Sequence, residues 1–340
     1  MKFTTSILAF AICGLFTATT TDAGKHKHKK PMRKTATDVY QGNSFFDKFD
    51  FFTAADPTHG FVNYVDAKTA RSNNLTLVKN NIVYIYSDHK NVAPSNGRMS
   101  VRLSSKNTYD SGLFVFDILH MPVGCGTWPA VWTVGGSWPN NGEIDIVEGV
   151  NNQAQNAMTL HTNAGCTMAG VKRNQSGTTV TPNCDVKAPG QYANQGCGVT
   201  DTRTNSYGTG FNSNKGGVFV TKWSPSSGIQ IWFFPRNNIP QDIIDGNPKP
   251  ASWCLPNANF PFKSCPSSHF KGHQIVVDLT FCGDWAGNVF GQMCPGKGDC
   301  ASYVKNNPSA FKQAYWAFRS FKVYQNWAET IGIRKESVSD

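Results

Sequence analysis

The sequence predicts an all-β domain built as a β-sandwich, and two observations predict it. Short apolar runs rich in β-branched and aromatic residues are separated by turn-forming Gly, Pro, Asn and Ser, and they lie at 82–86, 113–118, 218–223, 229–234 and 275–279. Long amphipathic helical patterns are absent, and a short helix is expected only at Asn307-Pro308, where a capping residue precedes proline. No linker or repeat interrupts residues 38–330, so we expect one domain there.

The two ends of the chain are expected to lie outside that domain. Lys2 precedes an apolar run, 7–16, and small residues continue to Ala23, which is the layout of a signal peptide over residues 1–23. This run is too short to span a bilayer, and no later stretch approaches the roughly 20 residues that a membrane helix needs. Residues 24–37 form a basic disordered tail or pro-segment, and 331–340 a polar C-terminal tail. We therefore expect a secreted, extracellular protein with no membrane partner.

Charge and cysteine content exclude other classes of protein. The net charge is +10, but seven Lys or Arg residues against one Asp lie in residues 1–34, so a nucleic-acid partner is not expected. Ten cysteines are present, with Cys13 in the signal segment and nine spread from Cys125 to Cys300, and most of these should pair after export. An odd count leaves at least one free thiol or a bond outside the chain. No CxxC pair with metal spacing occurs, so no zinc site is expected.

Two further features fit an exported chain. Glycosylation sequons begin at Asn74 and Asn174. Residues 165–217 are rich in Gly, Asn and Thr, contain three of the cysteines, and are interpreted as a long polar loop. Loops of this length are usually functional or stapled, and a disulfide-held surface insertion is favoured over a binding loop.

The segment Glu143-Ile144-Asp145-Ile146-Val147-Glu148 places three carboxylates among β-branched apolar residues. Alternate residues of a strand share a face, so Glu143 and Asp145 project together, but Glu148 would fall on the core side. One inserted residue corrects this, and we therefore predict a β-bulge near Ile146-Val147. Without the bulge, the interpretation of Glu148 would fail.

Glycoside hydrolysis with retention would explain why three acids share one face of the strand. One carboxylate attacks the anomeric carbon, and a second, kept protonated about 5 to 5.5 Å away, serves the leaving oxygen and then water. Glu143 is the expected nucleophile and Glu148 the acid/base, while Asp145 is expected to keep Glu143 ionised and leave Glu148 with a raised pKa. The alternative is the solvated face of an ordinary amphipathic strand. The tryptophans just upstream favour catalysis, because flat rings suit pyranose faces; they are Trp128, Trp132 and Trp138.

The run 124–132 (GCGTWPAVW) followed by 138–151 (WPNNGEIDIVEGVN) resembles glycoside hydrolase family 16, and within it the fungal laminarinase-like endo-1,3(4)-β-glucanases. The resemblance covers the whole expected domain. It implies a jelly-roll of two curved antiparallel sheets with a concave substrate cleft. It also implies the same three catalytic roles, and substrate-binding roles for Arg102, Trp132, Trp138, His161 and Trp285. Taken alone, His161 would more often be structural, Arg102 a surface charge, and Trp285 as readily a core residue.

The leading hypothesis is hydrolysis of internal β-1,3 or mixed β-1,3/1,4 glucosidic bonds by a monomer that needs no cofactor and no metal. A cell-wall transglycosylase would use the same acids and stays an alternative. A β-glucan-binding protein without catalysis is a second alternative, which the presence of Glu143 and Glu148 disfavours.

Overall fold

The computed structural model describes residues 35–325. The expected signal peptide, most of the expected basic tail and the C-terminal tail therefore lie outside the described residues. Within the described part, none of the helices is long and apolar enough to cross a membrane.

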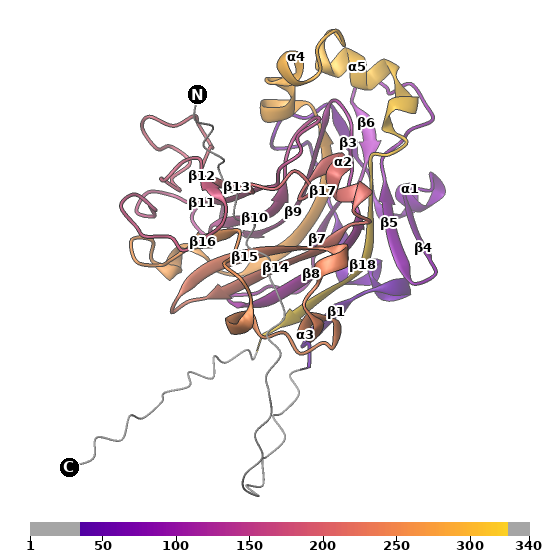
Figure 1. Cartoon of the computed structure of the whole chain (residues 1–340). Coiled ribbons are helices and arrows are strands. Elements are labelled where there is room, and N and C mark those ends of the chain that lie inside the picture. The colour runs from indigo at the N-terminus through magenta and orange to yellow at the C-terminus, as the bar shows by residue number, and fades with distance from the viewer. Residues whose placement is uncertain (1–34, 326–340) are drawn as a thin grey trace, which may run out of the picture.

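Two eight-stranded antiparallel sheets form the body of the molecule (Figure 1). One sheet, called here the β14 sheet, has the order β16 (Ala258–Phe260), β15 (Gly228–Pro235), β14 (Gly217–Ser224), β8 (Gly112–His120), β18 (Tyr315–Tyr324), β5 (Ile82–Tyr86) and β4 (Thr76–Lys79), with β1 (Asp38–Tyr40) also paired to β18. The other, the β10 sheet, has the order β12 (Thr178–Thr179), β13 (Cys197–Thr200), β11 (Ala157–His161), β10 (Glu143–Glu148), β9 (Thr127–Gly135), β17 (His273–Phe281), β7 (Arg102–Ser105) and β2 (Phe49–Phe51). The predicted all-β sandwich is confirmed.

The core lies between these two sheets because each sheet turns one face of alternating apolar residues toward the other. Phe116 and Phe321 of the β14 sheet and Val131 and Ile144 of the β10 sheet belong to one buried cluster. All five predicted apolar runs lie in strands: β5, β8, β14, β15 and β17. A small parallel pair, β3 (Val62–Tyr64) with β6 (Arg98–Ser100), stands apart from both sheets.

Helices are short in the described chain: α1 (Ala67–Ser72), α2 (Gly208–Ser213), α3 (Gln241–Ile244), α4 (Phe290–Met293) and α5 (Cys300–Asn306). At the predicted helix start, a single 3₁₀ segment, Pro308–Phe311, follows α5. The side-chain amide of Asn307 donates to the Tyr303 carbonyl of the preceding helix at 2.9 Å and does not cap the 3₁₀ segment. The helical segment therefore begins where it was predicted, but it is a 3₁₀ segment and the Asn307 side chain does not cap it.

Four disulfides join eight cysteines of the described chain: Cys125–Cys294, Cys166–Cys265, Cys184–Cys197 and Cys282–Cys300. Two of them hold the segment 165–217, as expected for a stapled insertion. That segment is not all loop, however, because β12, β13 and α2 lie in it and β13 pairs with β11. The strand was missed because Cys197-Gly-Val-Thr200 is short and contains glycine.

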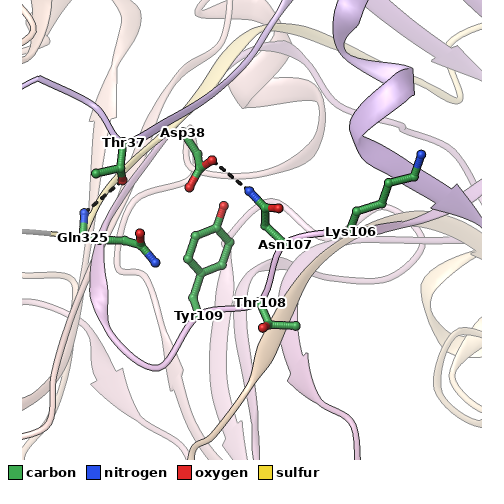
Figure 2. A pocket seen from close by; sticks show the side chains of 7 residues that line it. All are labelled: Thr37, Asp38, Lys106, Asn107, Thr108, Tyr109 and Gln325. Atoms are coloured by element: carbon green, nitrogen blue, oxygen red, sulfur yellow. Dashed lines mark hydrogen bonds between the residues drawn. The ribbon is translucent and has the colours of Figure 1, made fainter.

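An open polar pocket of 490 Å³ lies where the two ends of the described chain meet (Figure 2). Residues 37–38, 106–109 and Gln325 line it, and the Asn107 amide donates to the Asp38 carboxylate at 2.8 Å. None of the expected site residues lines this pocket, so it does not enter the chemistry below.

Candidate active site

The predicted β-bulge is present in β10. Against β9, Asp145 pairs with Trp132 and Glu148 pairs with Ala130, so three steps along β10 correspond to two along β9. The same shift appears against β11, where Asp145 pairs with Thr159 and Glu148 with Ala157. An extra residue on one strand against a regular partner is the definition of a bulge.

The bulge brings Glu148 to the same face as Glu143 and Asp145. Ile146 and Val147 are both fully buried in the core, whereas Glu148 is half-buried on the opposite face, called here the site face. Trp128 of β9 also projects there, and its indole Nε1 donates to Glu148 Oε1 at 2.9 Å. All three acids of the segment therefore share one face.

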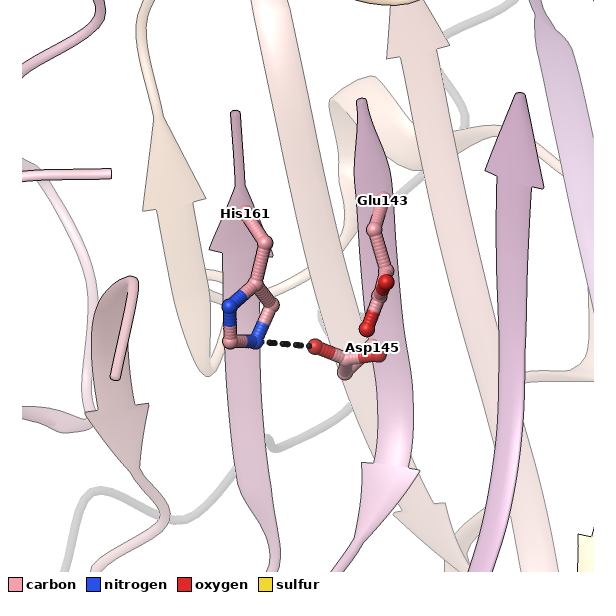
Figure 3. A group of neighbouring side chains, drawn as sticks. All are labelled: Glu143, Asp145 and His161. Atoms are coloured by element: carbon pink, nitrogen blue, oxygen red, sulfur yellow. Dashed lines mark ion pairs between the residues drawn. The ribbon is translucent and has the colours of Figure 1, made fainter. Parts of the chain in front are cut away.

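His161 joins the acids from the neighbouring strand (Figure 3). It pairs with Glu143 in the register of β10 and β11, and its Nε2 lies 3.0 Å from Asp145 Oδ2. The carboxylates of Glu143 and Asp145 and the His161 imidazole offer ligand atoms within 4.8 Å of one another. Such a donor set suits a divalent cation, but the ion pair between Asp145 and His161 already engages two of its members.

Burial raises the pKa of all three carboxyl groups. For Glu143, the largest cause is desolvation, and the neighbouring Asp145 raises the pKa further. For Asp145, desolvation and then the charge of Glu148 raise the pKa. For Glu148, desolvation raises the pKa, while the hydrogen bond from Trp128 opposes the rise. The expectation that Asp145 lowers the pKa of Glu143 is not met, because two acids this close disfavour each other's ionised form.

The other expected binding residues surround this cluster. The Arg102 guanidinium lies 5.0 Å from the Trp132 ring centre and 4.6 Å from that of Phe52. Trp285, in the π-helical turn Gly283–Gly287, meets Trp128 edge to face at 5.7 Å. Trp138 lies in the connection between β9 and β10 and is 45% exposed. Trp128, Trp132 and His161 thus lie beside the acids, whereas Trp138 lies in the loop that joins the ends of two interior strands.

A fourth buried carboxyl group, that of Asp278 in β17, was missed. It pairs with Ala130 of β9, the residue that pairs with Glu148 on the other side, so Asp278 also projects onto the site face. Arg102 Nη1 lies 4.0 Å from its Oδ2. Burial raises the pKa of Asp278 to about 7, against the opposing effect of Arg102. Strand alternation could have found it. Asp278 lies within the apolar run 275–279 and shares a strand face with Gln274, so it points away from the core-facing residues Ile275 and Val277.

Two antiparallel sheets that present paired carboxylic acids beside tryptophans on an outer face define a class of protein: the β-sandwich glycoside hydrolases. The family model for the XgeA-like, catalytic GH16 domain matches residues 49–324. The chain belongs to glycoside hydrolase family 16.

Relatives within the family are similar over most of the chain. An endo-1,3(4)-β-glucanase of Arthroderma benhamiae is 50% identical over 294 residues, which cover 85% of this chain and 64% of that protein. The chain therefore spans less than two thirds of that relative's length.

Two solved structures are also similar. Laminarinase 16A of Phanerochaete chrysosporium, with 6-O-glucosyl-laminaritriose in its donor and acceptor sites, is 46% identical with a TM-score of 0.81. The match covers 86% of this chain and 99% of that one. An elongating family 16 β-1,3-glucosyltransferase is 42% identical with a TM-score of 0.79, covering 85% and 99%. The fold and the family are thus shared by hydrolytic and transferring enzymes.

Proposed function

We propose that the protein is a secreted, monomeric endo-β-glucanase that hydrolyses internal β-1,3 and mixed β-1,3/1,4 glucosidic bonds with retention of configuration. The observation that carries the proposal is the bulge in β10, which places Glu143, Asp145 and Glu148 on one face. The names of the Arthroderma benhamiae relative and of laminarinase 16A support the substrate class.

Retention requires two displacements at the anomeric carbon. In the first, a Glu143 oxygen forms a bond to that carbon, and Glu148 gives its proton to the glycosidic oxygen as the bond to the leaving sugar breaks. In the second, Glu148 takes a proton from water, and the resulting hydroxide oxygen replaces Glu143 on the same carbon. Both glutamates end in their starting protonation states.

The crowded carboxyl groups supply the proton that this scheme needs. Since burial and mutual repulsion raise all three pKa values, the cluster keeps its protons to a higher pH than isolated acids would. Glu143 and Asp145 share a hydrogen bond, so Asp145 can take the shared proton as Glu143 becomes the attacking anion. His161, 3.0 Å from Asp145, fixes that carboxyl in place. Trp128 does the same for Glu148.

The experiment that tests the proposal compares Glu143→Ser and Glu148→Ser with the wild-type protein on laminarin. Each change removes a group that forms or breaks a bond, so we expect a loss of about a thousandfold or more in kcat, measured as reducing ends released. Asp50→Ser, on the edge strand β2 of the same sheet, is the control and should keep normal activity. Normal hydrolysis by either glutamate variant would refute the assignment.

The stereochemistry is read in the same experiment by proton NMR of the first product. The β anomer should form first, and an initial α anomer would require an inverting mechanism instead. Linkage profiles on laminarin, lichenan and a β-1,6-branched glucan would define the accepted bonds.

Transfer to a second glucan is the alternative that a specific observation favours. The 42% identical glucosyltransferase shows that a similar fold serves transfer in another protein. In that case the deglycosylating acceptor is a sugar hydroxyl in place of water. A ladder of products longer than the starting oligosaccharide would support transfer over hydrolysis.

A further inference from the structure

The bulge in β10 leaves backbone groups without their usual ladder partners. Where two residues face one, the extra residue is left unpaired and the regular hydrogen bonds stop. Here the interruption lies between Asp145 and Glu148, in a segment that is buried on its core side. Buried backbone groups without partners are costly, so some other group must meet them.

One side chain meets two of these groups. Asn156 Nδ2 donates to the Ile146 carbonyl at 2.8 Å, and Asn156 Oδ1 accepts from the Glu148 amide at 3.0 Å. A side-chain amide has the same donor and acceptor as a peptide group, so Asn156 substitutes for the missing ladder partner across the bulge. The side chain is fully buried, which keeps water from competing for these bonds.

Asn156 is itself fixed from a separate part of the chain. Its backbone amide donates to Ser206 Oγ at 3.0 Å, and its carbonyl accepts from the Asp201 amide at 2.9 Å. Ser206 Oγ in turn donates to the Arg203 carbonyl at 2.9 Å. The bulge is therefore held by the segment 201–206 as well as by the two neighbouring strands.

We propose that Asn156 is a positioning residue for Glu148, acting through the backbone of the bulge to hold the acid/base in line with the leaving oxygen. The inference rests on the proposed function. It follows from the geometry: the Glu148 amide is one of the two groups that Asn156 binds, and the Glu148 carboxylate is tied at its other end to Trp128 Nε1. With the amide released, the backbone at Glu148 would be held by its pairing with β9 and β11 alone, and its carboxylate by the indole contact.

The test uses leaving groups that differ in their need for a proton. Asn156→Ser and Asn156→Ala are compared with wild type on a laminarioligosaccharide and on the 2,4-dinitrophenyl β-glycoside of laminaribiose. Dinitrophenolate leaves without protonation, whereas a sugar alkoxide needs a general acid. We expect kcat/KM to fall about 10- to 100-fold on the oligosaccharide and less than about twofold on the aryl glycoside, since a small misplacement of a catalytic group has effects of this size.

Asn212→Ala is the matched control. Asn212 lies in α2, and its side chain also bridges two backbone groups. Its Oδ1 accepts from the Met121 backbone N–H and its Nδ2 donates to the Met121 carbonyl, both at 2.9 Å. Unlike Asn156, it lies on an element that contacts the β14 sheet. This variant should lose stability and leave the ratio of the two kcat/KM values unchanged. Asn156→Ser retains a small hydroxyl and covers the case in which Asn156→Ala does not fold.

Two results would overturn the inference. Equal losses on both substrates, or a ratio like that of Asn212→Ala, would show that Asn156 only supports the fold. Glu148→Ala separates this failure from a failure of the proposed function, because it should show the same dependence on the leaving group in stronger form. If Glu148→Ala shows none, the acid/base assignment is wrong and the role of Asn156 falls with it.

Discussion

Four carboxyl groups share the site face of the β10 sheet, and burial is the first cause of the raised pKa in each of them. They differ in what else surrounds them. Glu148 has the Trp128 indole, Asp145 has His161, and Asp278 has Arg102. The hydrogen bond from Trp128 lowers the pKa of Glu148, and the charge of Arg102 lowers that of Asp278, each against the effect of burial. This is how residues of one chemical type can come to hold protons differently.

The pKa of Asp278 makes stability depend on pH. It is about 7 in the folded protein against an ordinary value of 3.8, so between these values the folded state holds a proton that the unfolded chain has lost. Stability from this group is therefore full below pH 4 and declines until pH 7. Asp278→Asn cannot ionise and should be more stable than wild type at pH 8 by about 1 to 4 kcal/mol, with the gap closing toward pH 4.

Urea unfolding at pH 4.5, 6 and 8 measures this difference. Asp50→Asn, an exposed carboxyl of β2, is the control and should change stability little at any of these values. A constant gap between wild type and Asp278→Asn across the range would contradict the prediction.

The residues of the site were partly readable from sequence. Glu143, Asp145 and Glu148 stand close together in one segment, so local spacing was enough to place them. Asp278 and His161 come from other strands, and their positions beside the acids depend on strand order and register, which local spacing does not specify. The relation between Asp145 and Glu143 was anticipated with the wrong sign, since the charge of Asp145 raises the pKa of its neighbour Glu143.

At the scale of elements, the bulge was predictable and the strand β13 was not. The bulge follows from the six residues of the segment alone. Regular alternation would place Glu143 and Asp145 on one face of the strand and Glu148 on the opposite face, which must be buried. The pairing of β13 with β11 follows from disulfides and long-range contacts, including Cys184–Cys197. Its four residues have too little apolar character to stand out from a polar segment.

The disulfide Cys282–Cys300 lies next to the turn that carries Trp285. It joins the end of β17 to the start of α5, and Trp285 follows Cys282 by three residues. The double variant Cys282→Ser/Cys300→Ser should loosen this turn and raise KM for laminarin several-fold, besides costing about 2 to 4 kcal/mol of stability. Steady-state kinetics at a temperature well below unfolding separates the two effects.

Cys184→Ser/Cys197→Ser is the matched control, because that disulfide closes a loop of similar span beside β13. It should lower stability with KM nearly unchanged. Equal KM values in the two double variants would show that the Cys282 bond does not position Trp285.

At the scale of the whole molecule, we propose that the protein is exported and loses its first 23 residues. The charge and apolar pattern at the N-terminus support this, and the four disulfides suit an oxidising compartment. Expression in a fungal host should release to the medium a chain that begins at Gly24, as read by N-terminal sequencing. Asn74 and Asn174 are both exposed, so enzymatic deglycosylation should lower its mass. Retention of residues 1–23 on the secreted chain would contradict the proposal.

The bulge has a consequence for insertions and deletions. Measured along β9, Glu148 lies only two residues from Asp145, which is the spacing of a strand with one residue fewer. A chain that lacked either Ile146 or Val147 could therefore place its glutamate in the same slot, opposite Ala130 and Ala157, with a regular ladder. The side-chain amide of Asn156 would then have no interrupted strand pairing to bridge. Motif length and the side chain at that position are thus expected to change together as such domains diverge.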